Sequence, residues 1–214
     1  MALSEWTILK NNINARATLT TTSPIAGGAS LVLSDNGTVN PQIVMIRTLT
    51  SEKRLLQAKM RTIARLDQVD GAGFGFVFMM DREDITKTEG NFYGLFVGKT
   101  RVVGNEIVLA KFFDGLENPP TTVLYYTDYN PVGVFTLEVE WESDLGSVGG
   151  THIIIRRSDP TVDSVTFDSL GVIYDQIDTS SPLVITRGEG IAYHNVFGGS
   201  NSFTLDKSSL IRVV

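Results

Sequence analysis

The chain has 214 residues, 42% of them hydrophobic and 20% charged, which fits one larger all-β domain or two small domains with a sizeable core. The formal net charge is −6 and the pI is about 4.9, so the summed field repels phosphate backbones and we expect no nucleic-acid partner. The absence of cysteine excludes disulfides, thiolate metal sites and a cysteine nucleophile.

The N-terminal sequence MALSEWTILKNNINARATLT lacks the basic start and apolar run of a secretory signal. Nowhere do about 18 apolar residues follow one another, which is what a membrane-spanning helix needs. We therefore predict a soluble chain with no signal peptide, no transmembrane segment and no membrane insertion. The two histidines, His152 and His194, are too far apart for the common zinc spacings.

Segments that alternate apolar and polar residues recur along the whole chain, and they are rich in β-branched and aromatic residues. Short turn clusters separate them, as in Asp35-Asn36-Gly37 and Asn118-Pro119-Pro120. The pattern predicts strands at 16–22, 29–34, 42–49, 54–66, 73–80, 91–97, 101–112, 121–127, 133–142, 151–157, 162–168, 183–186, 190–196 and 203–213. Such spacing is typical of a sandwich or barrel. No linker or repeat interrupts it, so we predict a single domain over residues 1–214.

The stretch SEKRLLQAKMRTIARLD, residues 51–67, fits both a helix and a strand. Its residue types are good helix formers, and Leu56, Met60 and Ile63 follow helical spacing. The same stretch alternates apolar with charged side chains, as a long strand with one apolar face does. We predict the strand, over 54–66, because the neighbouring segments are all strands and context outweighs propensity.

The order of these segments resembles that of a known family. A long strand (KMRTIARLD) leads into GAGFGFVFMMDRE, NFYGLFVG, VFTLEVEWES and THIIIRRSD, and the chain closes with FTLDKSSLIRVV. This order is similar to the concanavalin A-like lectin/glucanase superfamily, in its LamG-type jelly roll, over residues 42–214. The resemblance implies an all-β fold, a two-sheet antiparallel jelly-roll sandwich. Residues 1–41 are then an added strand pair or an assembly arm.

The segment GVFTLEVEWE, residues 133–142, has two different sides if it is a strand. Its apolar side holds Phe135, Leu137, Val139 and Trp141, which we expect to point into the sandwich together with Phe74, Phe76 and Phe78. Its other side holds Glu138, Glu140 and Glu142. Some glucanases of the resembling superfamily carry Glu-x-Asp-x-Glu on such a strand, which makes this row the candidate catalytic set of a hydrolase.

The row departs from that pattern in two ways. The middle residue is Glu140 rather than Asp, and no Trp-rich segment lies nearby to stack sugars. An antiparallel strand with one solvated side produces the same alternation without any catalysis. We therefore favour a solvated face with no catalytic residue, on which Glu138, Glu140 and Glu142 contribute little to stability.

Two further groups of charged residues are candidates. The loop DREDITKTEG holds Asp81, Glu83, Asp84 and Glu89, whose oxygens suit calcium, and calcium is common in the superfamily that the chain resembles. No EF-hand spacing is present, so we favour a solvated acidic turn and no cofactor. Lys59, Arg61 and Arg65 form a basic stripe on the outer face of the long strand, which either blocks aggregation or meets an acidic partner.

Two tyrosine-containing segments are candidate binding surfaces, because such rings offer contact area to a sugar or protein at low entropic cost. The candidates are Tyr125, Tyr126, Asp128, Tyr129 and Asn130 in VLYYTDYNP, and Tyr193, His194, Asn195 and Asn201 in GIAYHNVFGGSNS. An ordinary tyrosine-rich strand end is the alternative. Tyr126→Ala and Tyr193→Ala test these surfaces, because loss of binding without loss of folding would place the site there. We expect His152 to cap a core edge.

Two functions fit these observations. The first is a non-enzymatic recognition and assembly module, which binds glycans or other virion proteins as a homo-oligomer. A phage-type virion structural or attachment protein, found in the virion or outside the cell after lysis, is the setting that needs no signal peptide. The second is a glucanase-type glycoside hydrolase that uses Glu138, Glu140 and Glu142. The surroundings of those carboxylates discriminate between the two functions.

Overall fold

The computed structural model describes residues 7–10, 16–21, 25, 28–35, 42–48, 57–68, 71–82, 85, 89–98, 105–116, 120–144, 149–183, 188–195, 202–206 and 211–213. The strands are β1 (Thr7–Lys10), β2 (Arg16–Thr20), β3 (Ser30–Ser34), β4 (Gln42–Thr48), β5 (Gln57–Gln68), β6 (Ala72–Met80), β7 (Phe92–Gly98), β8 (Glu106–Phe112), β9 (Thr122–Asp128), β10 (Val134–Asp144), β11 (Gly150–Arg157), β12 (Gly171–Asp178), β13 (Gly188–Asn195), β14 (Ser202–Asp206) and β15 (Ile211–Val213). Among these described residues, no helix has the length and apolar character needed to cross a membrane.

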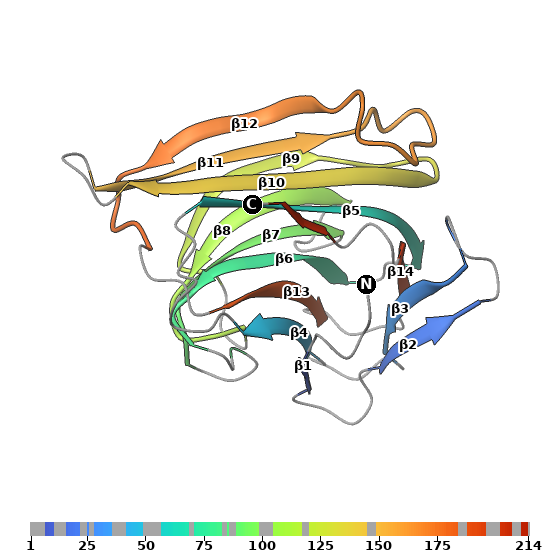
Figure 1. Ribbon diagram of the computed structural model, residues 1–214, viewed down its shortest axis with the longest axis horizontal. Coiled ribbons are helices and arrows are strands. Elements are labelled where there is room, and N and C mark those ends of the chain that lie inside the picture. Colours follow the sequence, from blue (N-terminus) through green and yellow to red (C-terminus); the bar gives the residue numbers. More distant parts are fainter. Residues whose placement is uncertain are drawn as a thin grey trace.

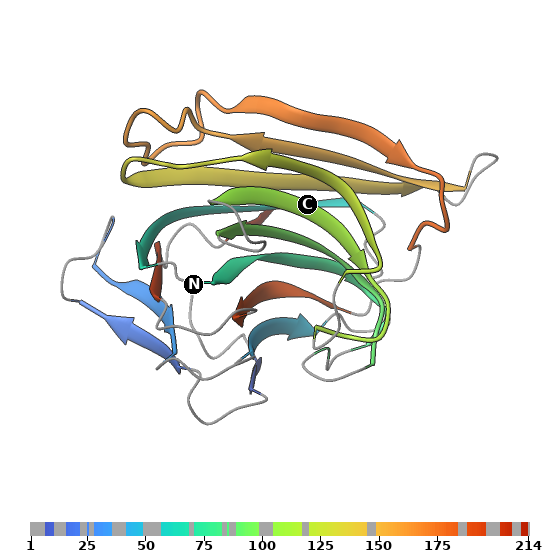
Figure 2. The ribbon, with the colours of Figure 1, turned by 180° about the vertical axis from the view of Figure 1, so that it is seen from behind.

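The strands form two antiparallel sheets that pack face to face (Figure 1). The seven-stranded sheet has the order β1-β4-β13-β6-β7-β8-β9. The eight-stranded sheet has the order β12-β11-β10-β5-β14-β3-β2, and β15 pairs with β5 beside this path. The view from behind shows the same two curved layers (Figure 2). The predicted all-β, two-sheet antiparallel sandwich is therefore confirmed.

The long ambiguous stretch is a strand, as predicted. β5 pairs with β10 along one edge and with β14 and β15 along the other. These pairings bury its apolar residues Ala58, Met60 and Ala64 against the opposite sheet. Helix propensity, which is worth at most about 0.7 kcal/mol per residue for such side chains, does not compete with pairing on two sides.

The prediction of a strand at 162–168 is wrong. Residues 158–170 instead form an irregular excursion that leaves β11, crosses the outer face of the eight-stranded sheet and returns to begin β12. The sequence pattern missed two strands, β1 and β12, and for β12 the pairing gives a reason. Its pairing with β11 shifts register between Ile155 and Arg156, so a β-bulge breaks the period of two that would have marked it. The predicted strand 203–213 contains β14 and β15, and residues 207–210 between them lie outside the described residues, as do 184–186 of the predicted strand 183–186.

Large aromatic side chains fill the space between the sheets. Phe78 of β6 stacks on Trp141 of β10 with ring centroids 4.7 Å apart, and Phe74 contacts Phe203 at 5.0 Å. The rings predicted to point inward, on β6 and β10, are all buried. Within the seven-stranded sheet, Gly75 of β6 lies close to the β7 backbone, because a Cβ there would lie 1.7 Å from the Leu95 carbonyl oxygen.

A second apolar cluster covers the outer face of the seven-stranded sheet. Phe92 and Phe112 stack with centroids 4.7 Å apart, on strands β7 and β8. Ile85 and Leu116 lie over them, and the Leu116 amide donates to the Ile85 carbonyl at 2.9 Å. Where Ile85 and Leu116 lie over it, the seven-stranded sheet is therefore buried on both faces.

A buried ion pair joins the two sheets at one end of the core. Lys111 of β8 lies 3.0 Å from an Asp178 carboxylate oxygen at the end of β12, and both side chains are 2% exposed. The Tyr93 hydroxyl donates to the same carboxylate at 2.6 Å and accepts from the Leu183 amide at 3.1 Å. Burial and the neighbouring carboxylate both raise the pKa of Tyr93, so its hydroxyl stays a donor. The contacts fix the segment that leaves β12.

Removing one partner of this ion pair should destabilise the fold strongly. Asp178→Asn leaves the Lys111 ammonium without its counter-charge in the core, and we expect a loss of about 3–5 kcal/mol in the free energy of unfolding. Urea denaturation measures it. The control is the double variant Lys111→Met with Asp178→Leu, which removes both charges and should recover most of the loss. Equal stability of Asp178→Asn and wild type would show that the pair is not formed.

Candidate functional site

The three glutamates of β10 lie on the outer face of the eight-stranded sheet. Glu138 pairs in register with Arg61 of β5 and Arg156 of β11. Glu140 lies one step further along the strand, and Glu142 lies opposite His152 of β11. The predicted alternation is confirmed, because the residues between them point into the core.

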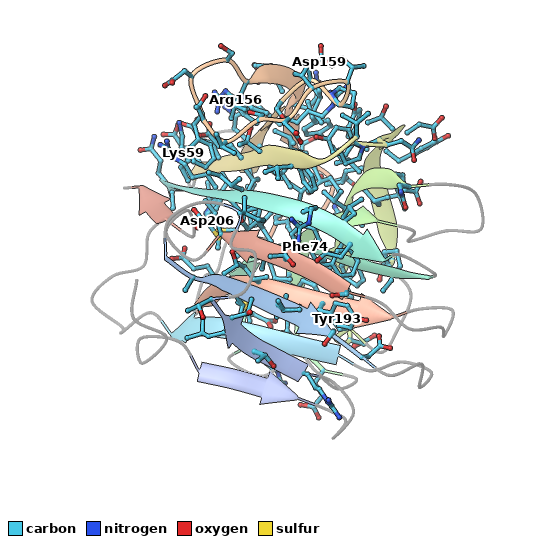
Figure 3. All side chains as sticks on the ribbon, turned by 90° about the vertical axis from the view of Figure 1, so that its right-hand side faces the viewer. Lys59, Phe74, Arg156, Asp159, Tyr193 and Asp206 are labelled. Carbon is cyan, nitrogen blue, oxygen red and sulfur yellow. The ribbon has the colours of Figure 1, made fainter. Side chains whose placement is uncertain are left out.

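Glu138 and Glu140 belong to an ion cluster, here called the outer-face charge cluster, with Lys59, Arg61 and Arg156. The Arg156 Nη1 donates to Glu138 at 2.8 Å and to Glu140 at 2.7 Å. Lys59 Nζ lies 3.4 Å from Glu138 and 3.0 Å from Glu140, and Arg61 Nε lies 3.6 Å from Glu138. Lys59 and Arg156 lie on the same upper part of the molecule in Figure 3. Each glutamate therefore meets at least two cations.

The expectation that the whole row faces solvent is wrong for Glu138. Its side chain is 7% exposed, while Glu140 is partly exposed and Glu142 is exposed. Lys59, Arg61 and Arg156 surround Glu138, and the 158–170 excursion lies beside them, since the Ser158 amide donates to the Thr136 carbonyl at 3.0 Å and the Phe167 ring lies 4.9 Å from the Arg61 guanidinium carbon. The Glu138 end of the row is therefore the less accessible end.

The cluster holds Glu140 in its ionised form. Burial raises the pKa of Glu140, but hydrogen bonds from Arg156 and Lys59 outweigh it and leave the pKa below the ordinary value. The same contacts raise the pKa of Arg156 against the opposing effect of burial. Such a carboxylate is a counter-ion and not a proton donor at neutral pH.

The basic stripe predicted on β5 is largely neutralised. Lys59 and Arg61 meet the β10 glutamates, and Arg65 forms an ion pair with Asp67 of the same strand. The sequence showed both charge signs, but only the strand register places them opposite one another. Arg156, which binds both glutamates, was missed for that reason.

His152 does not cap a core edge. It lies within β11 on the outer face, and its Nε2 lies 2.6 Å from an Asp175 carboxylate oxygen of β12. This pair and Glu142 stand on three neighbouring strands. Within the described part of the chain, no group of three or more His, Cys, Asp or Glu side chains is arranged to hold a metal ion.

The calcium candidates of the 81–90 loop have protein partners where they are described. Asp81 accepts hydrogen bonds from the Asn91 amide and the Asn91 side chain, both at 2.8 Å. Glu89 forms an exposed ion pair with Arg82. Glu83 and Asp84 lie outside the described residues.

The tyrosines of β9 have three different environments. Tyr126 is 58% exposed, and Asp128 and Asn130 beside it are exposed. Tyr125 is half-buried against Tyr174 of β12, with ring centroids 5.3 Å apart. Among the VLYYTDYNP candidates, Tyr126, Asp128 and Asn130 therefore form the accessible group.

Tyr129 was wrongly predicted as a binding residue. It is 1% exposed, and the Arg157 guanidinium lies 4.9 Å from its ring centroid. Burial raises the pKa of Tyr129 to about 12. The ring is a core residue because it packs edge-to-face on Phe135.

Tyr193 does not lie on an accessible rim, where the sequence pattern placed it. It lies within β13, is fully buried, and donates a hydrogen bond to Asp35 at the end of β3. Its ring packs on Phe203 with centroids 5.6 Å apart, so an alanine here would leave a core cavity. The side chains of His194 and Asn195, and all of Asn201, lie outside the described residues.

Solved structures share this arrangement of sheets. A legume lectin-like domain from Entamoeba histolytica matches with a TM-score of 0.54 and 13% identity, over 94% of this chain and 89% of that one. A point mutant of the Emp46p carbohydrate recognition domain matches with a TM-score of 0.57 and 10% identity, over 95% and 88%. The alginate lyase Aly36B matches with a TM-score of 0.50 and 12% identity, over 89% and 84%.

The chain has the concanavalin A-like lectin fold. The predicted resemblance is thus confirmed at the level of the fold. No protein-family profile matches the sequence, and no curated protein matches it. Because lectin domains and a lyase share the concanavalin A-like fold, the fold does not choose between binding and catalysis. The residues on its surface must decide.

The two ends of the glutamate row should differ in their effect on stability. Glu138→Gln removes a nearly buried charge from three cations, and we expect a loss of about 1–3 kcal/mol in the free energy of unfolding. Glu142→Gln is the matched control on the same face, and it should stay within about 0.5 kcal/mol of wild type. Urea denaturation of both variants checks this. Equal effects of the two substitutions would contradict the described cluster.

Ionisation of Glu140 should make stability depend on pH in a defined direction. Its pKa in the folded state lies below the ordinary 4.5, so its contribution is full above the unfolded-state pKa and is lost as pH falls through the lower folded-state value. We expect the stability difference between wild type and Glu140→Gln to be constant from pH 7 to about pH 5 and to shrink in stronger acid. A difference that persists unchanged at about pH 2 would contradict this assignment.

Proposed function

We propose that the protein is a non-catalytic carbohydrate-recognition module. The observation that carries this proposal is the engagement of Glu138 and Glu140 by Lys59, Arg61 and Arg156. A glycoside hydrolase needs one carboxyl group that stays protonated as an acid and a second that is free to act as nucleophile or base. In the outer-face charge cluster, both carboxylates serve as counter-ions.

Access to the row supports the same conclusion. A glucan that approached Glu138 from the outer face would meet the Phe167 ring beside Arg61. Trp141, the tryptophan of this strand, points into the core and offers no stacking surface. Sugar-cleaving sites combine accessible carboxylates with aromatic rings, and at this end of the row the Glu138 side chain is only 7% exposed.

Support for carbohydrate as the ligand comes from the fold and from one surface. The matched Emp46p structure is a carbohydrate recognition domain, and the match extends over nearly the whole of both chains. On this chain, Tyr126 presents an exposed ring, and Asp128 and Asn130 add a carboxylate and an amide at the same strand end. A ring that stacks on a sugar, together with groups that hydrogen-bond hydroxyls, is the chemistry that sugar recognition requires.

The setting of this recognition stays a prediction. We keep the sequence-based proposal of a virion structural or attachment protein that binds glycans or other virion proteins. A recognition module with single weak sites gains affinity when several copies act together, which favours a homo-oligomer.

Glycan binding and hydrolysis can be tested on the same samples. We expect wild type to be retained on at least one glycan of an array, and Tyr126→Ala to weaken that binding about tenfold through loss of stacking. Val123→Ala, on the same strand and also exposed, is the matched control and should bind as wild type does. No release of reducing ends from β-glucan is expected.

Two outcomes would contradict the proposed function. One is β-glucan cleavage that disappears in a folded Glu138→Gln variant, which would establish the hydrolase. The other is the absence of binding to any glycan by a folded wild type, which would leave the module without a carbohydrate ligand.

A further inference from the structure

The eight-stranded sheet has two edges of opposite chemistry. Its strand path begins at β12 and ends at β2, and within the described residues neither strand has a second neighbour. Figures 1 and 2 place β12 and β2 on opposite sides of the molecule. An edge strand presents unpaired backbone groups to any chain that approaches it. The side chains on each edge therefore determine which chain can bind there.

The β12 edge is apolar and acidic. Val172 is 55% exposed and Ile177 is 57% exposed, and the exposed carboxylate of this strand is Asp175, because Asp178 is buried against Lys111. The neighbouring 158–170 excursion adds further exposed apolar and acidic side chains. Its exposed apolar and acidic residues are Val162, Val165, Asp159, Asp163 and Asp168. Exposed valines and isoleucines beside carboxylates form a surface suited to an apolar and basic partner.

The charge imbalance extends beyond the edge itself. Residues 112–186 hold 12 of the 24 acidic side chains and only two of the 18 lysines and arginines. Both of those cations are engaged within the molecule, Arg156 by the β10 glutamates and Arg157 by the Tyr129 ring. The remaining 16 basic side chains lie elsewhere in the chain, so the molecule is electrically polarised along its sequence.

The β2 edge has the complementary character. Arg16, Thr18 and Leu19 are exposed on this edge, and Leu19 is a large apolar side chain. Residues 6–34 contain Lys10 and Arg16 and no acidic residue. Lys10 belongs to β1, the edge strand of the other sheet. β2 thus carries one cation, Arg16, and no acidic residue, and its exposed Leu19 pairs with the core residue Leu31 and so lies on the inner face.

We propose that the β12 edge of one copy of this chain binds the β2 edge of a second copy, head to tail. Asp175 would meet Arg16, because both side chains lie on the outer face of the sheet, and Val172 and Ile177 would lie beside Thr18 on that face. Two β12 edges brought together by a two-fold axis would place carboxylates against carboxylates, which the charges oppose. A head-to-tail contact leaves each copy with one free edge of each kind, so it produces a ring or an open chain of copies. The contact is independent of glycan binding.

Charge reversal at each edge tests this contact. Analytical ultracentrifugation of wild type at about 50 mM salt should show mass rising with protein concentration, and salt at about 300 mM should reduce it. Asp175→Lys and Arg16→Glu should each weaken self-association about tenfold. Glu89→Lys is the matched control, because Glu89 is also an exposed carboxylate with a single ion-pair partner and lies on neither edge. It should associate as wild type does.

Mixing the two weakened variants gives the decisive measurement. In the mixture, the lysine-bearing β12 edge of one variant can meet the glutamate-bearing β2 edge of the other, and the two unaltered edges can also meet. We expect the mixture to regain association, a result that misfolded variants cannot give. A wild type that stays monomeric at millimolar concentration would overturn the proposal. So would an Asp175→Lys variant that associates normally, or a mixture that gains nothing.

Discussion

The two faces of β10 constrain the rest of this molecule. The strand lies in the interior of the eight-stranded sheet, between β5 and β11, so every second side chain must enter the core and the others must leave it. Inward, Trp141 stacks on Phe78 of the opposite sheet and helps set how closely the sheets approach. Outward, the glutamates fall beside the cations of β5 and β11. Neither face can change without moving the other, because one backbone carries both.

The outer-face charge cluster shows how such a sheet accommodates a carboxylate on its outer face. Glu138 is nearly buried, and burial of an unpaired charge is unfavourable. Three cations on neighbouring strands offset that cost, and Arg156 links both glutamates through one nitrogen. A row that has the spacing of a catalytic strand therefore acts as a structural ion cluster.

The distribution of charge makes the molecule electrically polar. Acidic side chains gather in the middle of the sequence and on the β12 edge, while the N-terminal strands are basic. A lectin-type sandwich gains from repetition because its single sites are weak. Edges of opposite sign provide a way to repeat the unit without altering the strand end that carries Tyr126.

The sequence by itself determined the all-β class, the strand nature of β5 and the inward aromatics of β6 and β10, because alternation is a local property that the backbone geometry converts directly into two faces. The sequence did not predict the features that depend on tertiary contacts. The bulge in β12 hid that strand, and Tyr129 and Tyr193, which look like exposed strand-end rings, are buried by partners distant in sequence, Arg157 and Asp35. The environment of Glu138 depended on strand register. Only the tertiary structure could decide whether that carboxylate meets solvent or cations, since its neighbours Arg61 and Arg156 lie on strands far away along the chain.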